Sequence, residues 1–171
     1  FEYSQDVDFL KNRGYPFIRE VAAFYETYLI KDSENIYQIV PSQSPENKFK
    51  ESGADHPVSL CCSSAMDIQL AQAVLTYAIK ASEILKVDNE KRKKWNEILN
   101  MLPKLKIGEK GQLLEWGDEF TEEEPQHRHF SHLIGLYPFD LISKDTNPEL
   151  YQAARKSLEL RLEAGGAHTG W

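Results

Sequence analysis

The stretch from Ser64 to Leu85 is the longest run of helical periodicity in the chain, and it limits the fold more than any other feature. Apolar residues return every three or four positions, the spacing that places side chains on one face of a helix. The residues on this face are Met66, Leu70, Ala73, Val74, Tyr77, Ala78, Ala81 and Leu85. Ser64 with Asp67 three positions later resembles a capping box. We therefore predict one long helix with a single face to bury.

Helical spacing recurs along most of the chain. Two further predicted helices cover residues 7–10 and 17–29 on either side of a break at Gly14-Tyr15-Pro16, with Val7, Phe17 and Phe24 in their apolar pattern. The others cover residues 88–102 with Asp88 as cap, a short turn at 131–136, and residues 147–165 with Asn147 as cap and Leu162 among the apolar positions. Residues 36–40 are expected to be extended, because Pro41 disfavours a helical residue before it. The sequence predicts an all-α fold of helix pairs with long loops, as a bundle or an α/α toroid; without a repeat of fixed period a solenoid is disfavoured.

Composition and charge exclude several kinds of partner. With 171 residues, 41% of them hydrophobic, the chain is long enough for one domain with a core. Its net charge is −7, and its one basic run, residues 91–94, falls within a predicted helix, so we expect no nucleic-acid partner. No apolar run is long enough to cross a bilayer, so we expect no membrane insertion.

The cysteines and the two ends of the chain indicate little about its compartment. Cys61 and Cys62 are neighbours, too close for an ordinary disulfide and not spaced like a zinc pair. The chain opens at Phe1 and stops at Trp171 in a glycine-rich loop. We interpret it as a piece of a larger protein, whose remainder is then an expected partner.

A loop with restricted backbone freedom carries the first candidate catalytic group. Pro41 and Pro45 lie close together, which bars both a helix and a central strand, and Glu46 follows directly. A carboxylate on a stiff loop between apolar segments can be partly desolvated, which raises its pKa and lets it carry a proton near neutrality. Glu46 is therefore a candidate general acid, and the alternative is an ordinary exposed loop residue.

Three more clusters combine polar and aromatic side chains. They are Gln112-Leu113-Leu114-Glu115-Trp116, His127-Arg128-His129 followed by Phe130-Ser131-His132, and His168-Thr169-Gly170-Trp171. A carboxylate beside an indole is typical of sugar sites, where the ring packs on C–H faces and the carboxylate accepts hydroxyl hydrogen bonds. The alternative is a core Trp116 beside a surface Glu115. The acidic residues within 118–124 are most simply solvated.

The histidine-rich cluster has three interpretations. A zinc site is disfavoured, because Arg128 would repel a cation and no carboxylate or cysteine ligand lies at a usual offset. Hydrogen bonding to vicinal sugar hydroxyls suits the arginine fork and the imidazole nitrogens better. In the third interpretation one histidine caps the short helix and the others are solvated. Asp67 likewise either caps the long helix or faces a cleft.

Five motifs, in this order, resemble glycoside hydrolase family 95. They are Ser44-Pro45-Glu46-Asn47, Met66-Asp67 at the start of a helix, Gly111-Gln112-Leu113-x-Glu115-Trp116, His127-Arg128-His129-x-Ser131-His132-Leu133-x-Gly135-Leu136-Tyr137-Pro138, and Gly166-x-His168-Thr169-Gly170-Trp171. The resemblance covers nearly the whole chain. It implies that residues 1–171 are part of an (α/α)6 toroid of the six-hairpin glycosidase type, with long functional loops and with the N- and C-terminal remainder of the catalytic domain outside this chain.

The resemblance also implies an activity. Members of the family are α-L-fucosidases, typically acting on α-1,2-linked fucose in oligosaccharides or glycans, or α-L-galactosidases. Glu46 corresponds to their general acid. The further residues that the resemblance or the local motifs assign to sugar binding are Arg128, His129, Glu115, Trp116 and His168. Neither a metal nor a cofactor is expected.

The family inverts the anomeric configuration with a base that this chain does not contain. A water is activated by an asparagine of an upstream Asn-x-Asn motif, polarised by a downstream Asp, and neither motif occurs in residues 1–171. We therefore expect the isolated segment to be inactive. The resemblance also implies a secreted or periplasmic protein. The alternative function, from a different class, is a non-catalytic sugar-binding helical module that keeps Arg128 and His129.

Overall fold

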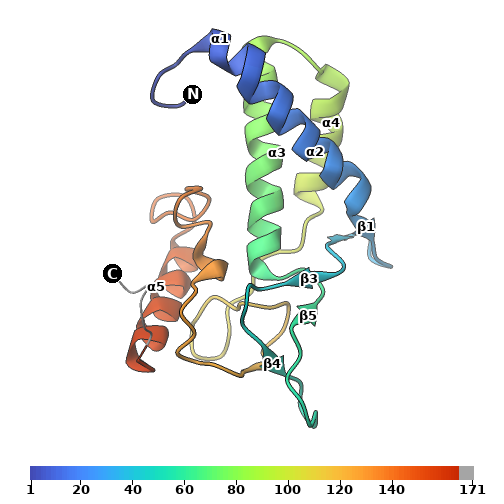
Figure 1. Ribbon diagram of the computed structural model, residues 1–171. Coiled ribbons are helices and arrows are strands. Elements are labelled where there is room, and N and C mark those ends of the chain that lie inside the picture. Colours follow the sequence, from blue (N-terminus) through green and yellow to red (C-terminus); the bar gives the residue numbers. More distant parts are fainter. Residues whose placement is uncertain (166–171) are drawn as a thin grey trace. The chain divides into compact units, whose positions relative to one another are not determined.

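The computed structural model describes residues 1–165, and it divides into two compact units (Figure 1). The first unit comprises residues 1–38 and 71–102, and the second comprises residues 39–70 and the chain from residue 103 onward. One helix, α3 (Ala65–Leu85), begins in the second unit and continues in the first. No helix within residues 1–165 combines the length and the apolar character that crossing a bilayer requires.

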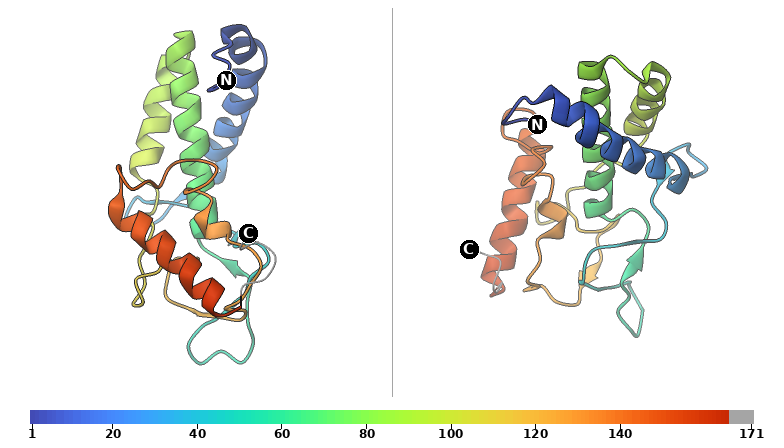
Figure 2. Two further views of the ribbon diagram at one scale, coloured as in Figure 1. Left: turned by 90° about the vertical axis from the view of Figure 1, so that its left-hand side faces the viewer. Right: turned by 45° about the horizontal axis from the view of Figure 1, so that its top comes forward.

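Helices make up most of the first unit (Figure 2). α2 (Tyr15–Tyr28) and α4 (Asn89–Asn100) contact each other, and the part of α3 from residue 71 runs beside them. The most completely buried apolar side chains here are Ala22, Ala71, Leu75, Ala78, Trp95 and Ile98. The predicted helices at 64–85 and 88–102 are thus confirmed, with ends that differ by no more than two residues.

A hairpin of two short strands follows α2. β1 (Ile30–Lys31) pairs antiparallel with β2 (Tyr37–Gln38). The second strand lies within the stretch that was predicted to be extended, residues 36–40, so this prediction is confirmed in part.

The predicted break at Gly14-Tyr15-Pro16 is wrong. α1 (Val7–Phe9), the π-helical turn η1 (Leu10–Gly14) and α2 follow one another without leaving helical backbone angles. The Tyr15 N–H bonds the Leu10 carbonyl, one residue further back than in an α-helix. This wider turn gives the proline ring room at a point where the α-helical hydrogen-bond pattern is interrupted.

Several apolar side chains of these helices are exposed. Val7, Phe17 and Phe24, which belong to the apolar pattern that predicted these helices, are 50%, 71% and 51% exposed. The buried side chains of the same segment are Leu10, Tyr15 and Ala22. The predicted apolar pattern therefore includes both buried positions, such as Leu10 and Ala22, and exposed ones, and the exposed side is of the kind that packs against other protein surfaces.

Short antiparallel strand pairs and a terminal helix build the second unit. β3 (Ser42–Gln43) pairs with β5 (Leu60–Cys61), and β4 (Phe49–Lys50) pairs with β6 (Thr121–Glu122). The sequence did not predict these strands, because two residues are too few to show an alternating pattern. The 3-10 turn η2 (Ser131–Leu133) and α5 (Pro148–Glu163) contribute to its core, whose buried residues are Leu113, Leu133, Ile142, Ala153 and Ala154.

The predicted capping box at α3 forms only in part, and Asp88 and Asn147 precede their helices as predicted but make no side-chain cap bond. At α3 the Ser64 hydroxyl accepts the Asp67 N–H at 3.3 Å, while the Asp67 carboxylate accepts the Ser42 hydroxyl at 2.7 Å. Asp88 does not cap α4, because its carboxylate accepts the Tyr15 hydroxyl at 2.6 Å instead.

Asn147 precedes α5 without capping it through its side chain. Its side-chain oxygen accepts the Ser143 N–H at 2.7 Å, and its amide group donates to the Leu141 carbonyl at 2.9 Å. The side chain therefore closes the preceding loop. Helix α5 begins at Pro148, as predicted.

Gln69 joins the beginning of α3 to the segment around η2. The side chain is fully buried, and its amide group donates to the carbonyls of Ala65 at 2.7 Å and His132 at 2.8 Å. Its oxygen accepts the Gly135 N–H at 2.7 Å. A Cβ atom at position 135 would collide with this oxygen, so the close approach requires glycine.

We expect Gly135→Ala to lower the free energy of unfolding by about 1–3 kcal/mol, because the added methyl group would displace Gln69 from its three hydrogen bonds. Urea unfolding of the full-length protein measures the loss. Gly117→Ala is the matched control, since a Cβ there meets only the Cys62 carbonyl at 3.5 Å, an ordinary contact. Equal losses in the two variants would contradict the role assigned to Gly135.

Candidate functional site

Two loops of the second unit meet at the candidate site. We call residues 44–47 the Pro45 loop and residues 127–131 the histidine loop. The Pro45 carbonyl lies 3.2 Å from His129 Nδ1 and accepts the Ser131 hydroxyl at 3.3 Å. Because a carbonyl can only accept, His129 Nδ1 carries a hydrogen, and the neutral ring presents Nε2 as an acceptor. The structure thus brings together two motifs that are far apart in the sequence.

The Glu46 carboxylate forms an ion pair with the Arg128 guanidinium across these loops. Both side chains are open to solvent, with 58% of Glu46 and 51% of Arg128 exposed. The partial desolvation predicted for Glu46 is therefore wrong for this chain, because the loop holds the carboxylate at the surface. Its contact with Arg128 joins two of the residues to which the resemblance assigns roles in one site.

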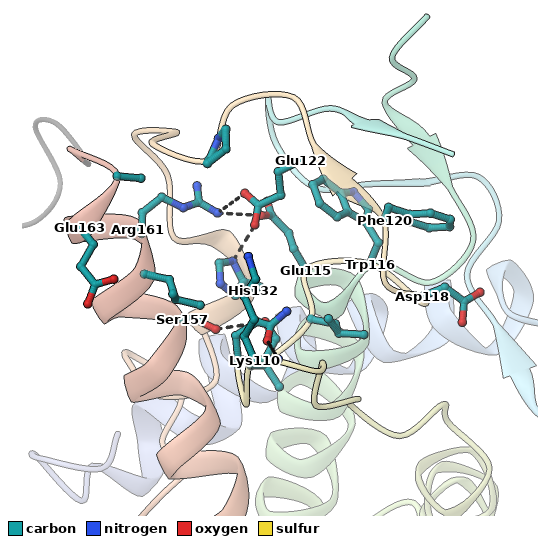
Figure 3. Close-up of a pocket in the computed structure, with 16 residues that line it drawn as sticks. Lys110, Glu115, Trp116, Asp118, Phe120, Glu122, His132, Ser157, Arg161 and Glu163 are labelled. Atoms are coloured by element: carbon teal, nitrogen blue, oxygen red, sulfur yellow. Dashed lines mark hydrogen bonds and ion pairs between the residues drawn. The ribbon is translucent and has the colours of Figure 1, made fainter. Parts of the chain in front are cut away.

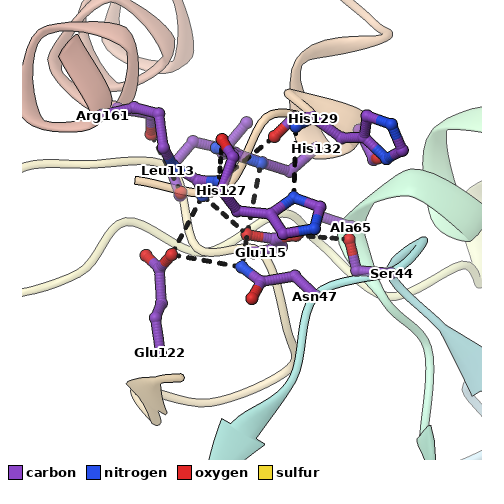
Figure 4. A network of polar contacts seen from close by, with 12 residues as sticks. Ser44, Asn47, Ala65, Leu113, Glu115, Glu122, His127, His129, His132 and Arg161 are labelled. Atoms are coloured by element: carbon purple, nitrogen blue, oxygen red, sulfur yellow. Dashed lines mark hydrogen bonds and ion pairs between the residues drawn. The ribbon is translucent and has the colours of Figure 1, made fainter. Parts of the chain in front are cut away.

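A buried carboxylate lies beneath the Pro45 loop (Figure 4). Glu115 accepts the Ser44 hydroxyl at 2.6 Å with one oxygen and the Asn47 amide at 3.2 Å with the other. Its own backbone is fixed as well, because its carbonyl accepts the Ala65 N–H at 3.1 Å at the start of α3. Glu115 is a buried residue with protein donors at both oxygens, whereas the sequence predicted an accessible sugar-binding group.

Arg161 of α5 completes this network and pairs with Glu115 at 3.0 Å (Figure 4). The side chain of each residue is only 3% exposed. Arg161 also donates to the carbonyls of His127 at 3.1 Å and His129 at 3.2 Å. One buried ion pair therefore bonds both the Pro45 loop and the histidine loop.

Glu122 is the second carboxylate on Arg161, at 3.0 Å. It also accepts the Asn47 amide at 3.3 Å. Burial raises the pKa of Glu122, against the lowering effect of Arg161. The sequence predicted a solvated acidic run here. That prediction is wrong for Glu122, because strand β6 directs it toward the network.

Burial and charge act in opposite directions on the titratable groups of the network. Burial disfavours the ionised form of Glu115, but His132, the Ser44 hydroxyl and Arg161 together hold the pKa of Glu115 below its usual value. Burial lowers the pKa of His132, against the attraction of Glu115, and it also lowers the pKa of His127. At neutral pH the network thus holds an ionised Glu115 and neutral imidazoles.

A hollow of about 380 Å³ borders this network on the side of α5 (Figure 3). Glu115, Trp116, His132 and Arg161 line it. Trp116 is only 4% exposed and packs against Phe49, with ring centroids 5.0 Å apart. Of the two interpretations of Trp116, a sugar platform or a core residue, its burial therefore agrees with the second. Its N–H and His132 Nδ1 have no hydrogen-bond partner among residues 1–165.

Two further predictions concern His168 and a metal. His168 lies outside the described residues. Within residues 1–165, no three side chains of histidine, cysteine, aspartate or glutamate are gathered as a metal site would need. The histidine loop instead bonds to itself, since the His129 N–H donates to His127 Nδ1 at 3.1 Å.

Sequence reasoning missed Arg161, although the sequence held a signal for it. Arg161 lies seven residues after Ala154 and four after Ser157, which is the spacing of one helix face. Both of these small residues are buried, whereas Leu162, which belongs to the apolar pattern of this helix, is 44% exposed. A charged residue on the buried face of a helix needs a buried partner.

Glu115 should make stability sensitive to acid. The pKa of Glu115 is lowered in the folded state. Its contribution to the free energy of unfolding is therefore complete above the pKa of the unfolded carboxyl, about 4.3, and is lost as the pH falls through the pKa of the folded state. We expect Glu115→Gln to cost about 3 kcal/mol at neutral pH, because Arg161 loses its most buried counter-ion. The difference from the wild type should shrink below about pH 4, as protonated glutamate comes to resemble glutamine.

Urea unfolding of the full-length protein at neutral and acidic pH measures both effects. Glu159→Gln is the control, since Glu159 is a half-exposed residue of α5 whose partner, Arg155, is exposed. It should leave stability nearly unchanged at every pH. A Glu115→Gln deficit that stays constant down to the acid transition would contradict the assigned charge state.

Comparison with known proteins identifies a family for this chain. The whole chain, residues 1–171, matches the profile of the glycosyl hydrolase family 95 catalytic domain. It is 36% identical over 173 residues to alpha-L-fucosidase 2 of Arabidopsis thaliana, and the match covers 100% of this chain and 20% of that protein. It is 26% identical over 179 residues to the probable alpha-fucosidase A of Aspergillus niger, covering 100% of this chain and 22% of the relative.

The chain spans about a fifth of the length of these curated relatives. The family match extends over every residue and includes both loops of the candidate site together with the buried network beneath them. The chain therefore belongs to glycoside hydrolase family 95, within the catalytic domain of that family.

Proposed function

We propose that the protein containing this chain is a glycoside hydrolase that removes terminal α-L-fucose, with Glu46 as its general acid. The observation that carries the proposal is the contact between Glu46 and Arg128 on two loops that a buried network holds together. Membership of family 95, and the names of the two relatives as fucosidases, support the class of substrate.

Each exposed group suits one part of this reaction. The Glu46 carboxyl is accessible enough to reach a glycosidic oxygen and deliver a proton to it. The Arg128 fork can donate to neighbouring sugar hydroxyls, and His129 Nε2 can accept from one. Substrate binding then draws the guanidinium from Glu46 to the sugar and leaves the carboxyl beside the departing oxygen.

The base of an inverting reaction has to come from outside this chain. Inversion requires a second group across the ring from the acid, far enough away to admit a water. Glu115 and Glu122, the carboxylates of the network, are both bound to Arg161 beneath the loops. We therefore propose that the base side belongs to the rest of the domain, as the resemblance implies, and that the isolated segment does not turn over substrate.

The fold of the complete domain is part of the same proposal. A toroid of paired helices would surround the loop cluster with helices from elsewhere in the protein, and the exposed Phe17 and Phe24 of α2 offer a surface for such packing. For the linkage we propose α-1,2-linked fucose on an oligosaccharide or glycan. Discrimination from L-galactose depends on contacts to the one hydroxyl by which the sugars differ.

Proton NMR of the full-length protein with a fucosyl-α-1,2-galactoside tests the reaction directly. We expect β-L-fucose to appear first, which is the inverted anomer. Glu46→Gln should lower turnover by about 10²–10⁴-fold with little change in sugar binding, because it removes the proton donor and keeps the shape of the side chain. Initial release of α-L-fucose would contradict inversion.

Glu51→Gln is the matched control, because Glu51 is an exposed glutamate of the same region outside both loops. It should leave turnover unchanged. Near-normal turnover of Glu46→Gln on this poor-leaving-group substrate would contradict the acid assignment. Release of L-galactose but not fucose would assign the α-L-galactosidase activity, and release of neither would favour the sugar-binding module.

A further inference from the structure

We propose that Glu115 and Arg161 are positioning residues. They hold the general acid, Glu46, and the sugar-binding histidine loop in place relative to each other, and neither touches the sugar. The proposal rests on the function proposed above. It concerns a part of the site that is buried, whereas the acid and the sugar-binding groups are exposed.

The hydrogen bonds of the pair flank the functional residues on both sides. Ser44 and Asn47, which donate to Glu115, lie just before and just after the Pro45-Glu46 dipeptide. On the other loop, the two carbonyls that Arg161 binds belong to the neighbours of Arg128. Glu46 and Arg128 are thus each held through adjacent residues, which leaves their own side chains free.

Both members of the pair are anchored to regular structure. Arg161 belongs to α5, where Ser157, one turn earlier, donates its hydroxyl to the Leu113 carbonyl at 3.0 Å. Leu113 in turn donates its N–H to the Ala153 carbonyl at 3.1 Å. The segment that carries Glu115 is therefore bonded to the same helix as Arg161, which fixes the distance between the two charges.

The arginine fork is required for this arrangement. One terminal nitrogen donates to two carbonyls of the histidine loop, and the other donates to Glu115 and Glu122. A lysine has a single nitrogen and no planar fork, so it can keep the charge but not these four bonds. Displacements of about 1 Å at a reacting group can cost about 100-fold in rate.

A comparison of two leaving groups separates positioning from general destabilisation. A fucosyl galactoside needs the acid to protonate its departing oxygen, whereas a nitrophenyl fucoside releases a stable phenolate without it. In the full-length protein, we expect Arg161→Lys to lower kcat/KM about 100-fold on the galactoside and about 10-fold on the nitrophenyl substrate. The smaller loss reflects weaker sugar binding through the histidine loop.

Ser44→Ala gives a second, milder test, because it removes only the 2.6 Å hydrogen bond that the Ser44 hydroxyl donates to Glu115. We expect about a 10-fold loss of kcat on the galactoside, little change on the nitrophenyl substrate and an unchanged KM for both. If circular dichroism shows that Arg161→Lys is unfolded, Ser44→Ala decides whether the pair has a positioning role. Arg155→Lys is the control, since Arg155 is an exposed arginine of the same helix.

The outcomes distinguish this proposal from the proposed function. A wild-type protein that hydrolyses neither fucoside overturns the function and the positioning role with it. An active wild type whose variants lose the same factor on both substrates overturns the positioning role alone. A loss that is larger on the galactoside, with Arg155→Lys unchanged, supports it.

Discussion

The arrangement of the second unit depends on one buried ion pair, between Glu115 and Arg161. Charges withdrawn from water are tolerated in a protein interior only when other groups satisfy them. Here the partners come from separate parts of the chain: the Pro45 loop, strand β6, the histidine loop and helix α5. The hydrogen bonds and ion pairs that satisfy these two charges therefore fix the positions of four segments relative to one another, although much of this unit has little regular secondary structure.

The site divides its charges by depth. Glu115 and Arg161 are ionised and nearly inaccessible, and their bonds are with the protein itself. Glu46 and Arg128 lie above them at the surface, where a sugar can reach them. In the proposed function, the buried layer supplies order and the exposed layer supplies the chemistry, which agrees with the general requirement that reacting groups be held by neighbours whose own positions are fixed.

The sequence predicted the helices well and the depth of the site residues poorly. Periodicity located α3, α4 and α5, because one buried face leaves a repeated pattern. The motifs identified Glu115 and Trp116 as residues near the site, but burial depends on segments distant in sequence, and both proved to be interior groups. Arg161 was missed because a single polar residue does not alter an apolar stripe. The general-acid role proposed for Glu46 came from the family resemblance, since its local sequence alone favours an ordinary exposed loop residue.

The difference in depth has a consequence for how ions in the medium act on this protein. Mobile ions screen charges that face water over about 8 Å at physiological ionic strength, and they hardly affect charges enclosed by protein. The Glu46–Arg128 pair, more than half exposed, is open to this screening, whereas the Glu115–Arg161 pair is not. Added salt is therefore expected to weaken the Glu46–Arg128 contact while the Glu115–Arg161 pair keeps its strength, so that ionic strength acts on the proposed reacting groups and not on the buried framework.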